Sequence, residues 1–225
     1  MSRRLCLITG ASAGIGAAMA RTFAKAGYDV ALTARRTDRL EALADEIRLR
    51  FGVETFVIAA DLAQPEAADQ ILAELQSHGR VVDALVNNAG YGLPGTYGST
   101  AWQDQRDFLQ VLLVAVCDMT HKVLPGMVER RFGRVINVAS LAGLMPGSSG
   151  HTLYGATKSF MVRFSQSLHL ESAGTGVHVS ALCPGFTYSE FHDVNDTRET
   201  VSRSTPAWLW LGADEVAEQG YEAVE

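Results

Sequence analysis

The chain has 225 residues, of which 47% are hydrophobic and 20% are charged, and its net charge is −6. This length and composition are typical of a globular protein with a sizeable core. An acidic surface repels phosphate backbones, so we expect no nucleic-acid partner. We find no signal peptide and no run of the ~20 apolar residues that a membrane helix needs, so we expect a soluble, cytoplasmic protein without a membrane partner.

Short apolar runs alternate with longer amphipathic runs as far as Leu182. The apolar runs predict strands over Leu5–Thr9, Val30–Ala34, Thr55–Ala59, Ala84–Asn87, Arg134–Ala139 and Val177–Leu182. The amphipathic runs predict helices over Ile15–Ala26, Arg39–Arg50, Pro65–Gln76, Trp102–Arg130 and Leu153–Glu171. We expect the fourth of these helices to be bent or interrupted at Pro125-Gly126.

This alternation predicts a doubly wound α/β fold of the Rossmann type. Strands separated by helices pair in parallel, and right-handed crossovers place helices on both faces of the sheet. We expect a mostly parallel sheet of six or seven strands. No linker or repeat divides the sequence, which predicts a single domain over residues 1–225. The alternation stops after Cys183, and we expect a substrate lid at about residues 186–212.

A glycine-rich turn follows the first predicted strand and opens the first predicted helix. It reads Thr9-Gly10-Ala11-Ser12-Ala13-Gly14-Ile15-Gly16. Glycines in this position let the backbone approach a pyrophosphate, whose charge the helix N-terminus favours. The alternative is that these glycines only make a turn. The strand–turn–helix context favours nucleotide binding.

Four further motifs follow in order. Asn87-Asn88-Ala89-Gly90 ends the fourth strand, Ser140 follows the fifth, Tyr154 and Lys158 form a YxxxK pattern, and Pro184-Gly185 follows the sixth strand. With the TGxxxGIG turn, they resemble the motifs of the short-chain dehydrogenase/reductase family over nearly the whole chain. The resemblance implies an NAD(P)-binding oxidoreductase that moves a hydride between nicotinamide and a small carbonyl or alcohol substrate. It also implies that Ser140, Tyr154 and Lys158 are catalytic.

The resemblance further implies a set of cofactor-binding residues: Thr9, Gly10, Ser12, Ala13, Gly14, Ile15, Gly16, Asp61, Leu62, Asn88, Ala89, Gly90, Tyr154, Lys158, Pro184, Gly185 and Thr187. The second strand ends in Arg35-Arg36, without the carboxylate that would accept the ribose hydroxyls of NAD. We expect both arginines to bind the cofactor and Arg35 to pair with a 2′-phosphate, so we predict a preference for NADP(H) over NAD(H). The alternatives are a solvated arginine pair and, for Asp61, a helix cap.

Tyr154 and Lys158 are spaced i and i+4, which places both on one face of a helix. A free phenol has a pKa of about 10, and a nearby ammonium favours its ionised form. Tyr154 would then exchange a proton with the substrate oxygen. The resemblance implies that Lys158 also holds the nicotinamide ribose and that Ser140 orients the substrate carbonyl. Without this context the pair would be an ordinary surface pair.

The sequence departs from the family at two places. Relatives carry a catalytic asparagine in the fourth helix, and counting back from Pro125 places Leu112 there, within an apolar stripe that predicts a core position. We expect a slower or rerouted proton relay. Relatives also continue past the segment resembling Ala213 to Val224 into a last strand, so we expect either a truncated chain or a sheet that lacks its seventh strand.

The predicted lid carries aromatic residues that suggest an apolar pocket wall, namely Tyr188, Phe191, Trp208 and Trp210. We expect an apolar carbonyl substrate, and we interpret His151 and His192 as loop residues. Two other functions stay open. A nucleotide-binding sensor or scaffold without turnover is favoured by Leu112, whereas an epimerase or dehydratase acting on nucleotide sugars is disfavoured by the short chain.

The three cysteines, Cys6, Cys117 and Cys183, show neither metal-ligand nor CxxC spacing, so we predict reduced thiols and no metal site. Relatives commonly associate through their two long helices, here 102–130 and 153–171. Phe160 and Phe164 would face either a partner or the sheet. We therefore expect a homodimer or homotetramer.

Overall fold

The computed structural model describes residues 3–93, 95–190 and 206–225. The strands are β1 Leu5–Thr9, β2 Asp29–Ala34, β3 Thr55–Ala59, β4 Ala84–Asn87, β5 Gly133–Val138, β6 Val177–Leu182, β7 Phe186–Tyr188 and β8 Trp210–Gly212. The helices are α1 Gly14–Lys25, α2 Thr37–Phe51, α3 Ala67–Ser77, α4 Trp102–Leu109, α5 Ala115–Glu129, α6 Thr152–Glu171 and α9 Ala213–Glu222. Short 3-10 turns are η1 Tyr97–Ser99, η3 Leu141–Gly143 and η4 Ala207–Leu209, and η2 Gln110–Val114 is a π-helical turn.

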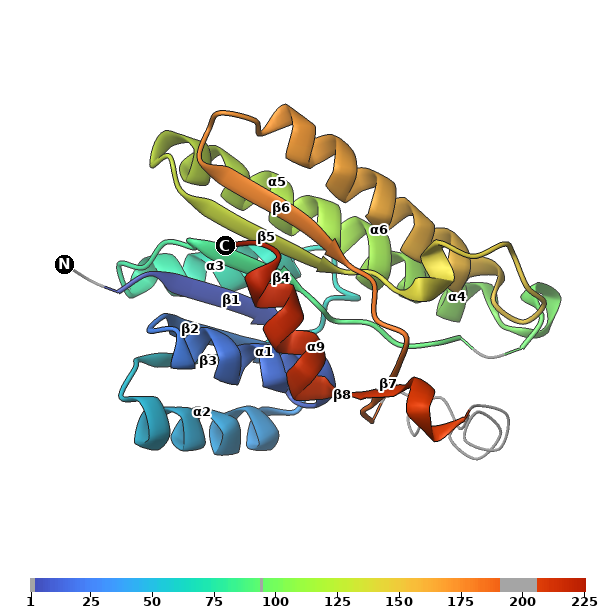
Figure 1. Cartoon of the computed structure of the whole chain (residues 1–225), viewed down its shortest axis with the longest axis horizontal. Helices are drawn as coiled ribbons and strands as arrows, with labels where there is room; N and C mark the ends of the chain where they lie inside the picture. The colour runs from blue at the N-terminus through green and yellow to red at the C-terminus, as the bar shows by residue number, and fades with distance from the viewer. Residues whose placement is uncertain (1–2, 94, 191–205) are drawn as a thin grey trace.

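The main sheet has six strands in the order β3-β2-β1-β4-β5-β6, and every pair is parallel (Figure 1). This is the Rossmann order, and the predicted fold class and all six predicted strands are confirmed. The chain winds outward from β1 in one direction and from β4 in the other. The carboxyl ends of β1 and β4 therefore border the crevice where such sheets bind ligands.

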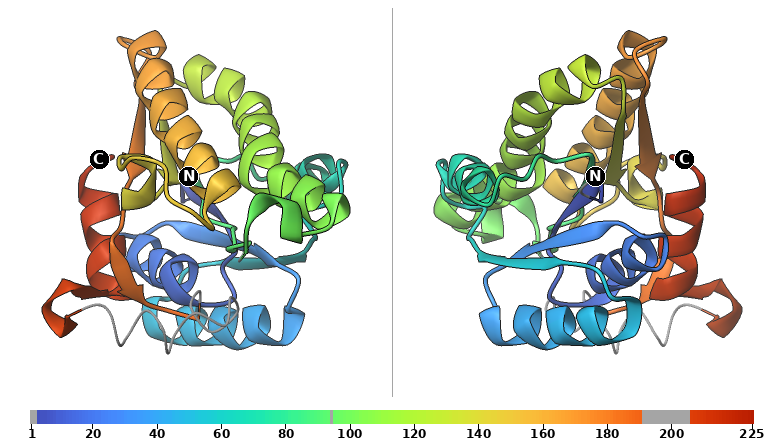
Figure 2. Two further views of the ribbon diagram at one scale, coloured as in Figure 1. Left: turned by 90° about the vertical axis from the view of Figure 1, so that its right-hand side faces the viewer. Right: turned by 90° about the vertical axis from the view of Figure 1, so that its left-hand side faces the viewer.

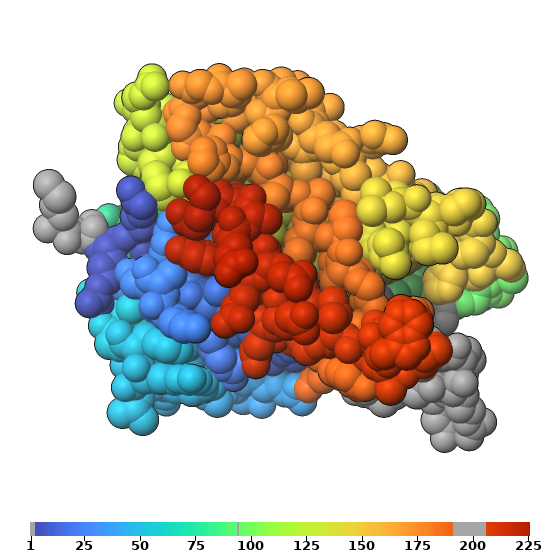
Figure 3. Space-filling model, in the orientation of Figure 1, coloured from blue at the N-terminus to red at the C-terminus, as the bar shows by residue number. Residues whose placement is uncertain are grey.

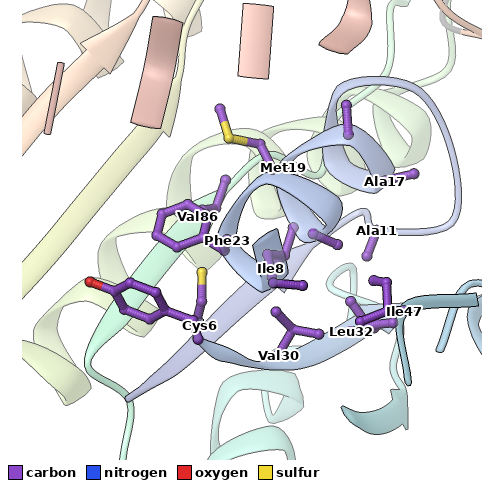
Figure 4. Packing of buried hydrophobic residues seen from close by; sticks show 14 of the residues in the cluster. Cys6, Ile8, Ala11, Ala17, Met19, Phe23, Val30, Leu32, Ile47 and Val86 are labelled. Atoms are coloured by element: carbon purple, nitrogen blue, oxygen red, sulfur yellow. The ribbon is translucent and has the colours of Figure 1, made fainter. Parts of the chain in front are cut away.

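Successive strand residues point to opposite faces of the sheet and build two separate cores. Cys6 and Ile8 of β1 face α1, α2 and α9, whereas Leu5 and Leu7 face α3, α5 and α6. In Figure 4, Met19 and Phe23 of α1 lie over the first of these faces. Burial on both sides explains why the strand sequences are apolar at consecutive positions rather than at alternate ones.

The predicted long helix is present as α4, η2 and α5, which together form one helix over Trp102–Glu129. The predicted interruption at Pro125-Gly126 is wrong, because Pro125 lies inside α5 and the irregular turn is η2 instead. Proline removes one backbone donor, and here the loss falls on the exposed face, where Pro125 and His121 both meet solvent. Water can replace the missing hydrogen bond there.

By length and composition alone, this same helix is apolar enough to cross a membrane, with a mean hydropathy of 1.5 in its most apolar window. The sequence-based expectation of no such run thus missed this helix, which by itself is weak evidence for a membrane span. Core helices of soluble proteins pass the same test. Phe108, Leu112 and Met119 are fully buried in this fold, as in a core helix.

The chain after β6, in the region of the predicted lid, contains two short strands that the sequence pattern did not predict. β7 and β8 pair in parallel as a separate two-stranded sheet, and Tyr188 stacks on Trp210 with ring centroids 4.9 Å apart. α9 then packs against α1 and β6, so closely that a Cβ on Gly220 would lie 2.6 Å from Met19 Cε. Figure 3 shows this C-terminal segment covering part of the N-terminal half. In the described residues, β6 remains an edge strand of the main sheet.

Candidate active site

The glycine-rich turn needs glycine at Gly10 and Gly16 for two different reasons. Gly10 has φ +66°, and a Cβ there would lie 2.8 Å from Ala89 Cα. A Cβ on Gly16 would lie 2.3 Å from the Gly10 carbonyl oxygen, so this glycine lets α1 approach the end of β1. Gly14 adds a second positive φ, +55°. The N-terminus of α1 consequently opens towards the crevice with its backbone N–H groups available to an anion.

Thr9 joins this turn to the motif after β4. Its hydroxyl oxygen accepts hydrogen bonds from the backbone N–H groups of Asn88 at 2.9 Å and Ala89 at 3.0 Å. The Asn88 side-chain amide donates a hydrogen bond to the Thr9 carbonyl oxygen at 2.9 Å. Because Thr9 is only 2% exposed, its predicted role as a direct cofactor contact does not fit the structure. Its side chain instead holds the two edges of the crevice together.

The two arginines after β2 take different positions. The Arg36 guanidinium donates to Ser12 Oγ in the glycine-rich turn through Nε at 3.2 Å and Nη2 at 2.9 Å. Its remaining nitrogen, Nη1, lies 2.9 Å from Glu190 Oε2. Arg35 is exposed and forms no ion pair with any described residue. The structure thus brings Arg36 rather than Arg35 against the predicted nucleotide turn.

Asp61 and Leu62 lie beyond the end of β3. Asp61 Oδ1 accepts a hydrogen bond from the Ala63 backbone at 3.1 Å and so organises the turn. The helix-cap alternative does not hold, because α3 begins later and its N-cap residue is Glu66. Leu62 packs against the apolar cluster of Phe108, Val111 and Leu112.

Ser140, Tyr154 and Lys158 are brought together by β5, η3 and α6. Ser140 caps η3, and its oxygen accepts a hydrogen bond from the Ala142 backbone at 3.2 Å. Burial raises the pKa of Tyr154, and its hydrogen bond with Ser140 acts in the opposite direction. One turn along α6, Lys158 Nζ lies 5.7 Å from the centre of the Tyr154 ring. The fourteen-residue spacing between Ser140 and Tyr154 thus still lets the two side chains meet.

The close approach of η3 to α6 depends on Gly143. A Cβ at this position would lie 2.6 Å from the Lys158 carbonyl carbon and 2.7 Å from its oxygen. Backbone atoms cannot move aside as a flexible side chain can. Gly143 therefore lets the turn that carries Ser140 rest directly on the helix that carries Tyr154 and Lys158. Sequence reasoning missed it, because nothing distinguishes this glycine from its neighbours in a glycine-rich loop.

Lys158 is 4% exposed and donates a hydrogen bond to the Val138 carbonyl oxygen at 2.7 Å. Burial lowers the pKa of its ammonium to about 8, and Cys183 acts weakly in the opposite direction. A buried ammonium whose proton is lost so readily beside a buried phenol is a pairing typical of a functional site. Such an arrangement supplies proton exchange at the mouth of the crevice.

Comparison with known proteins agrees with this geometry. A family model described as short chain dehydrogenase matches residues 4–200. The chain belongs to that family.

Two relatives illustrate the similarity. Sulfoacetaldehyde reductase of Chromohalobacter salexigens is 36% identical over 219 residues, which cover 94% of this chain and 84% of that protein. The NADP-dependent 3-hydroxy acid dehydrogenase of Salmonella typhi is 38% identical over 183 residues, covering 80% and 71%. Among solved structures, a short-chain dehydrogenase from Sphingobium yanoikuyae in complex with NADPH has a TM-score of 0.88 and 31% identity, over 97% of this chain and 84% of that one. The predicted family and the predicted oxidoreductase class are confirmed.

In this short chain dehydrogenase, Leu112 occupies a core position, as predicted. It is 0% exposed, and its Cγ would lie 3.5 Å from a Cβ placed on Gly90. Tyr154 and Leu153 pack against the same cluster. The π-helical turn η2 contains Leu112, and π turns are frequent at functional sites. A leucine at this point offers no polar group for hydrogen bonding.

The segment after β6 brings further predicted residues to the crevice. The Pro184 carbonyl accepts a hydrogen bond from the Leu141 backbone at 3.0 Å, and Thr187 Oγ1 donates to the Gly185 carbonyl at 3.2 Å. Thr187 is buried within β7. His151 immediately precedes α6, with its ring 6.4 Å from that of Tyr154. Phe191 and His192, and most of the predicted lid, lie outside the described residues.

Proposed function

We propose that this short chain dehydrogenase moves a hydride between NADP(H) and an apolar carbonyl or alcohol substrate, with Tyr154 as the proton donor and acceptor. The observation that supports this proposal best is the arrangement of Ser140, Tyr154 and Lys158 around the junction of η3 and α6. Two of these groups are hydrogen-bonded to each other and the third is a buried ammonium one helical turn away.

The residues around the crevice fit a dinucleotide. The missing Cβ atoms of Gly10 and Gly14 let Ala89 and Ser189 approach the turn closely, and α1 begins at this turn with its N-terminus. Ser12 and Arg36 form a polar pair at the end of β2, where a 2′-phosphate would need a cation. We therefore assign NADP(H) as the preferred cofactor, in line with two NADP-linked relatives in the comparison. When bound, the nicotinamide supplies or accepts the hydride.

Side chains of the protein itself transfer the proton. In reduction, the Tyr154 hydroxyl gives its proton to the substrate oxygen as negative charge develops there. Ser140 donates a hydrogen bond to the same oxygen and fixes its position. The Lys158 ammonium stabilises the phenolate that remains, and burial strengthens this interaction because the local dielectric constant is low. In oxidation the same steps run in reverse.

The side chains near the site favour an apolar substrate. Leu141, Leu144 and Met145 follow Ser140 and are 45%, 58% and 61% exposed. Tyr188 of β7 is also exposed, at 54%. Exposed large apolar side chains on a short turn beside a polar centre are typical of a binding surface rather than of a core. We propose a ketone or secondary alcohol with an apolar substituent.

The test is NADPH oxidation by the purified chain with a panel of ketones, aldehydes and diketones, followed as loss of nicotinamide absorbance. Tyr154→Phe removes the proton donor and should abolish turnover. Tyr221→Phe, on α9 away from the crevice, is the matched control. Oxidation that persists in Tyr154→Phe would contradict the assignment of Tyr154. Tight NADPH binding without turnover on any substrate would favour the alternative that Leu112 suggests, a nucleotide sensor.

We also propose that the chain forms at least a homodimer through α5 and α6, which lie side by side on one face (Figure 2). Phe160 is 36% exposed and stacks on Phe164 with ring centroids 5.7 Å apart, and Leu170 on the same helix is 73% exposed. Apolar side chains gathered on one helix favour a protein partner. Light scattering at micromolar concentration tests this, and a monomer would contradict it.

A further inference from the structure

A carboxylate forms ion pairs with the two arginines nearest to the predicted 2′-phosphate position. Glu190, just beyond β7, is 2.9 Å from Arg36 Nη1 through one carboxylate oxygen and pairs with Arg39 Nη1 through the other. Both arginines hold the pKa of Glu190 below its ordinary value, Arg39 most strongly. All three side chains are partly exposed, between 39% and 44%. They can therefore exchange partners with a ligand that arrives from solvent.

The backbone around Glu190 is held on the nucleotide turn by other contacts. Ser189 lies so close to Gly14 that a Cβ on this glycine would be 2.9 Å from Ser189 Cβ. β7 is anchored by its pairing with β8 and by the Tyr188–Trp210 stack. In Figure 2, the chain after β6 runs past the ends of α1 and α2. Glu190 therefore reaches Arg36 and Arg39 from just beyond the end of the anchored strand β7.

The Glu190 carboxylate and a 2′-phosphate bind arginine through the same kind of interaction. Carboxylates and phosphates both pair with guanidinium groups through charge-assisted hydrogen bonds. Arg36 already gives two donors to Ser12 and its third nitrogen to Glu190. A 2′-phosphate that takes this nitrogen must displace the carboxylate or accept a second negative charge beside it. NADH carries no 2′-phosphate and meets no such competition.

We propose that Glu190 is a specificity-determining residue that competes with the 2′-phosphate of NADP(H) for Arg36 and Arg39 and so limits the preference for NADP(H) over NAD(H). This inference rests on the proposed NADP(H) site at Ser12 and Arg36. A competing partner raises the apparent Kd by the reciprocal of the fraction of molecules in which it is not bound. NADPH must therefore displace the Glu190 carboxylate from these two arginines.

Glu190→Gln tests the proposal, because it keeps the size of the side chain and removes the charge. We expect NADPH and 2′,5′-ADP to bind about 5- to 10-fold more tightly to this variant, and NADH to stay within about twofold, if Glu190 holds the arginines in most molecules. 2′,5′-ADP carries the 2′-phosphate without nicotinamide and isolates the effect. The matched control is Glu54→Gln, an exposed carboxylate 2.7 Å from Arg80 at the opposite end of the sheet.

Titration calorimetry on the full chain, at one ionic strength, distinguishes the outcomes. Unchanged or weaker binding of NADPH to Glu190→Gln, with wild type still preferring NADPH over NADH, would overturn this inference and leave the proposed cofactor intact. Weaker binding of NADH alone would also overturn it, because Glu190 would then be holding the ribose hydroxyls. A wild-type chain that binds NADH more tightly than NADPH would overturn the proposed cofactor preference and this inference together.

Discussion

Lys158 places its ammonium nitrogen 5.7 Å from the centre of the Tyr154 ring while donating a hydrogen bond to the Val138 carbonyl at 2.7 Å. The lysine is thus tied to the end of β5 and not to the phenol itself. Its influence on Tyr154 is a through-space charge effect in a buried setting, which favours the phenolate. Both residues depend on α6 lying close to β5 and η3.

The first prediction concerns the pH dependence of carbonyl reduction. Burial raises the pKa of Tyr154, whereas the pKa of Lys158 is about 8, so kcat/KM should be level at neutral pH and should fall above about pH 8, where Lys158 loses the charge that stabilises the phenolate. In Lys158→Met this fall should be absent, and kcat should drop by about 100-fold because no ammonium stabilises the phenolate. pH–rate profiles of both proteins check this. Lys122→Met on α5 is the control, and an alkaline limb shared by wild type and Lys158→Met would contradict the charge effect.

The second prediction is a pH-dependent cost in stability. The pKa of Lys158 is about 8 in the folded protein, against an ordinary value of 10.5. Between these values the unfolded chain binds more protons, so the free energy of unfolding rises with pH. Below about pH 8 both states carry the proton and the cost is constant. In urea unfolding, the free energy of unfolding of wild type minus that of Lys158→Met should rise by about 3 kcal/mol from pH 7 to pH 10.5. A constant difference would contradict the lowered pKa.

Much of this fold follows from the sequence because its strands are buried on both faces. Cys6, Ile8 and Val86 lie in short runs that are apolar at consecutive positions. This pattern is typical of a strand buried on both faces, and each of these runs forms a strand. The motif residues Thr9, Asn88 and Ser140 could be placed near one another because the carboxyl ends of parallel strands share one edge. The crevice was therefore predictable, down to its neighbouring residues.

The features that escaped prediction depend on tertiary contacts without a periodic signal. β7 and β8 have three residues each, too short for alternation to show. The partners of Glu190 lie at the N-terminal end of α2, far away in the sequence, and no local pattern connects them with Glu190. The π turn at Leu112 keeps the apolar stripe of an ordinary helix, which is why the break was expected at Pro125 instead.

Gly143→Ala should damage catalysis more than folding. Its methyl group would meet the Lys158 backbone at 2.6 Å, so η3 must move away from α6 and carry Ser140 with it. A displacement of about 1 Å in a catalytic group costs up to about 100-fold in rate. We expect kcat to fall by more than tenfold while KM for NADPH is unchanged. The control is Gly147→Ala in the same loop, where a Cβ meets nothing within 4 Å. Equal effects of the two substitutions would argue against the role of Gly143.

Leu112→Asn tests whether the leucine limits turnover. The position is fully buried among Phe108, Val111 and Leu153, so removing the amide from water should lower the free energy of unfolding by about 2 kcal/mol. We expect turnover to rise despite this loss, because the amide can hold a water near Lys158. Leu112→Met, which keeps the apolar volume, is the control. Turnover unchanged in Leu112→Asn would mean that the leucine carries no catalytic cost.

The last prediction concerns a buried ion pair at the end of the sheet opposite the crevice. Asp29 is 2% exposed, and its carboxylate lies 2.8 Å from Arg80 Nη2 and accepts the Glu54 backbone N–H at 2.8 Å. Arg80→Met removes the nearer of the two cations beside this carboxylate and leaves only Arg3 Nη1, 4.0 Å away, which should lower the free energy of unfolding by about 3 kcal/mol. Glu54→Gln removes the exposed partner of the same arginine and should cost at most about 1 kcal/mol. Urea unfolding compares the two variants, and turnover of Arg80→Met below its transition should match wild type, because the pair touches no residue of the crevice. Similar losses in both variants would show that burial of Asp29 does not determine the effect.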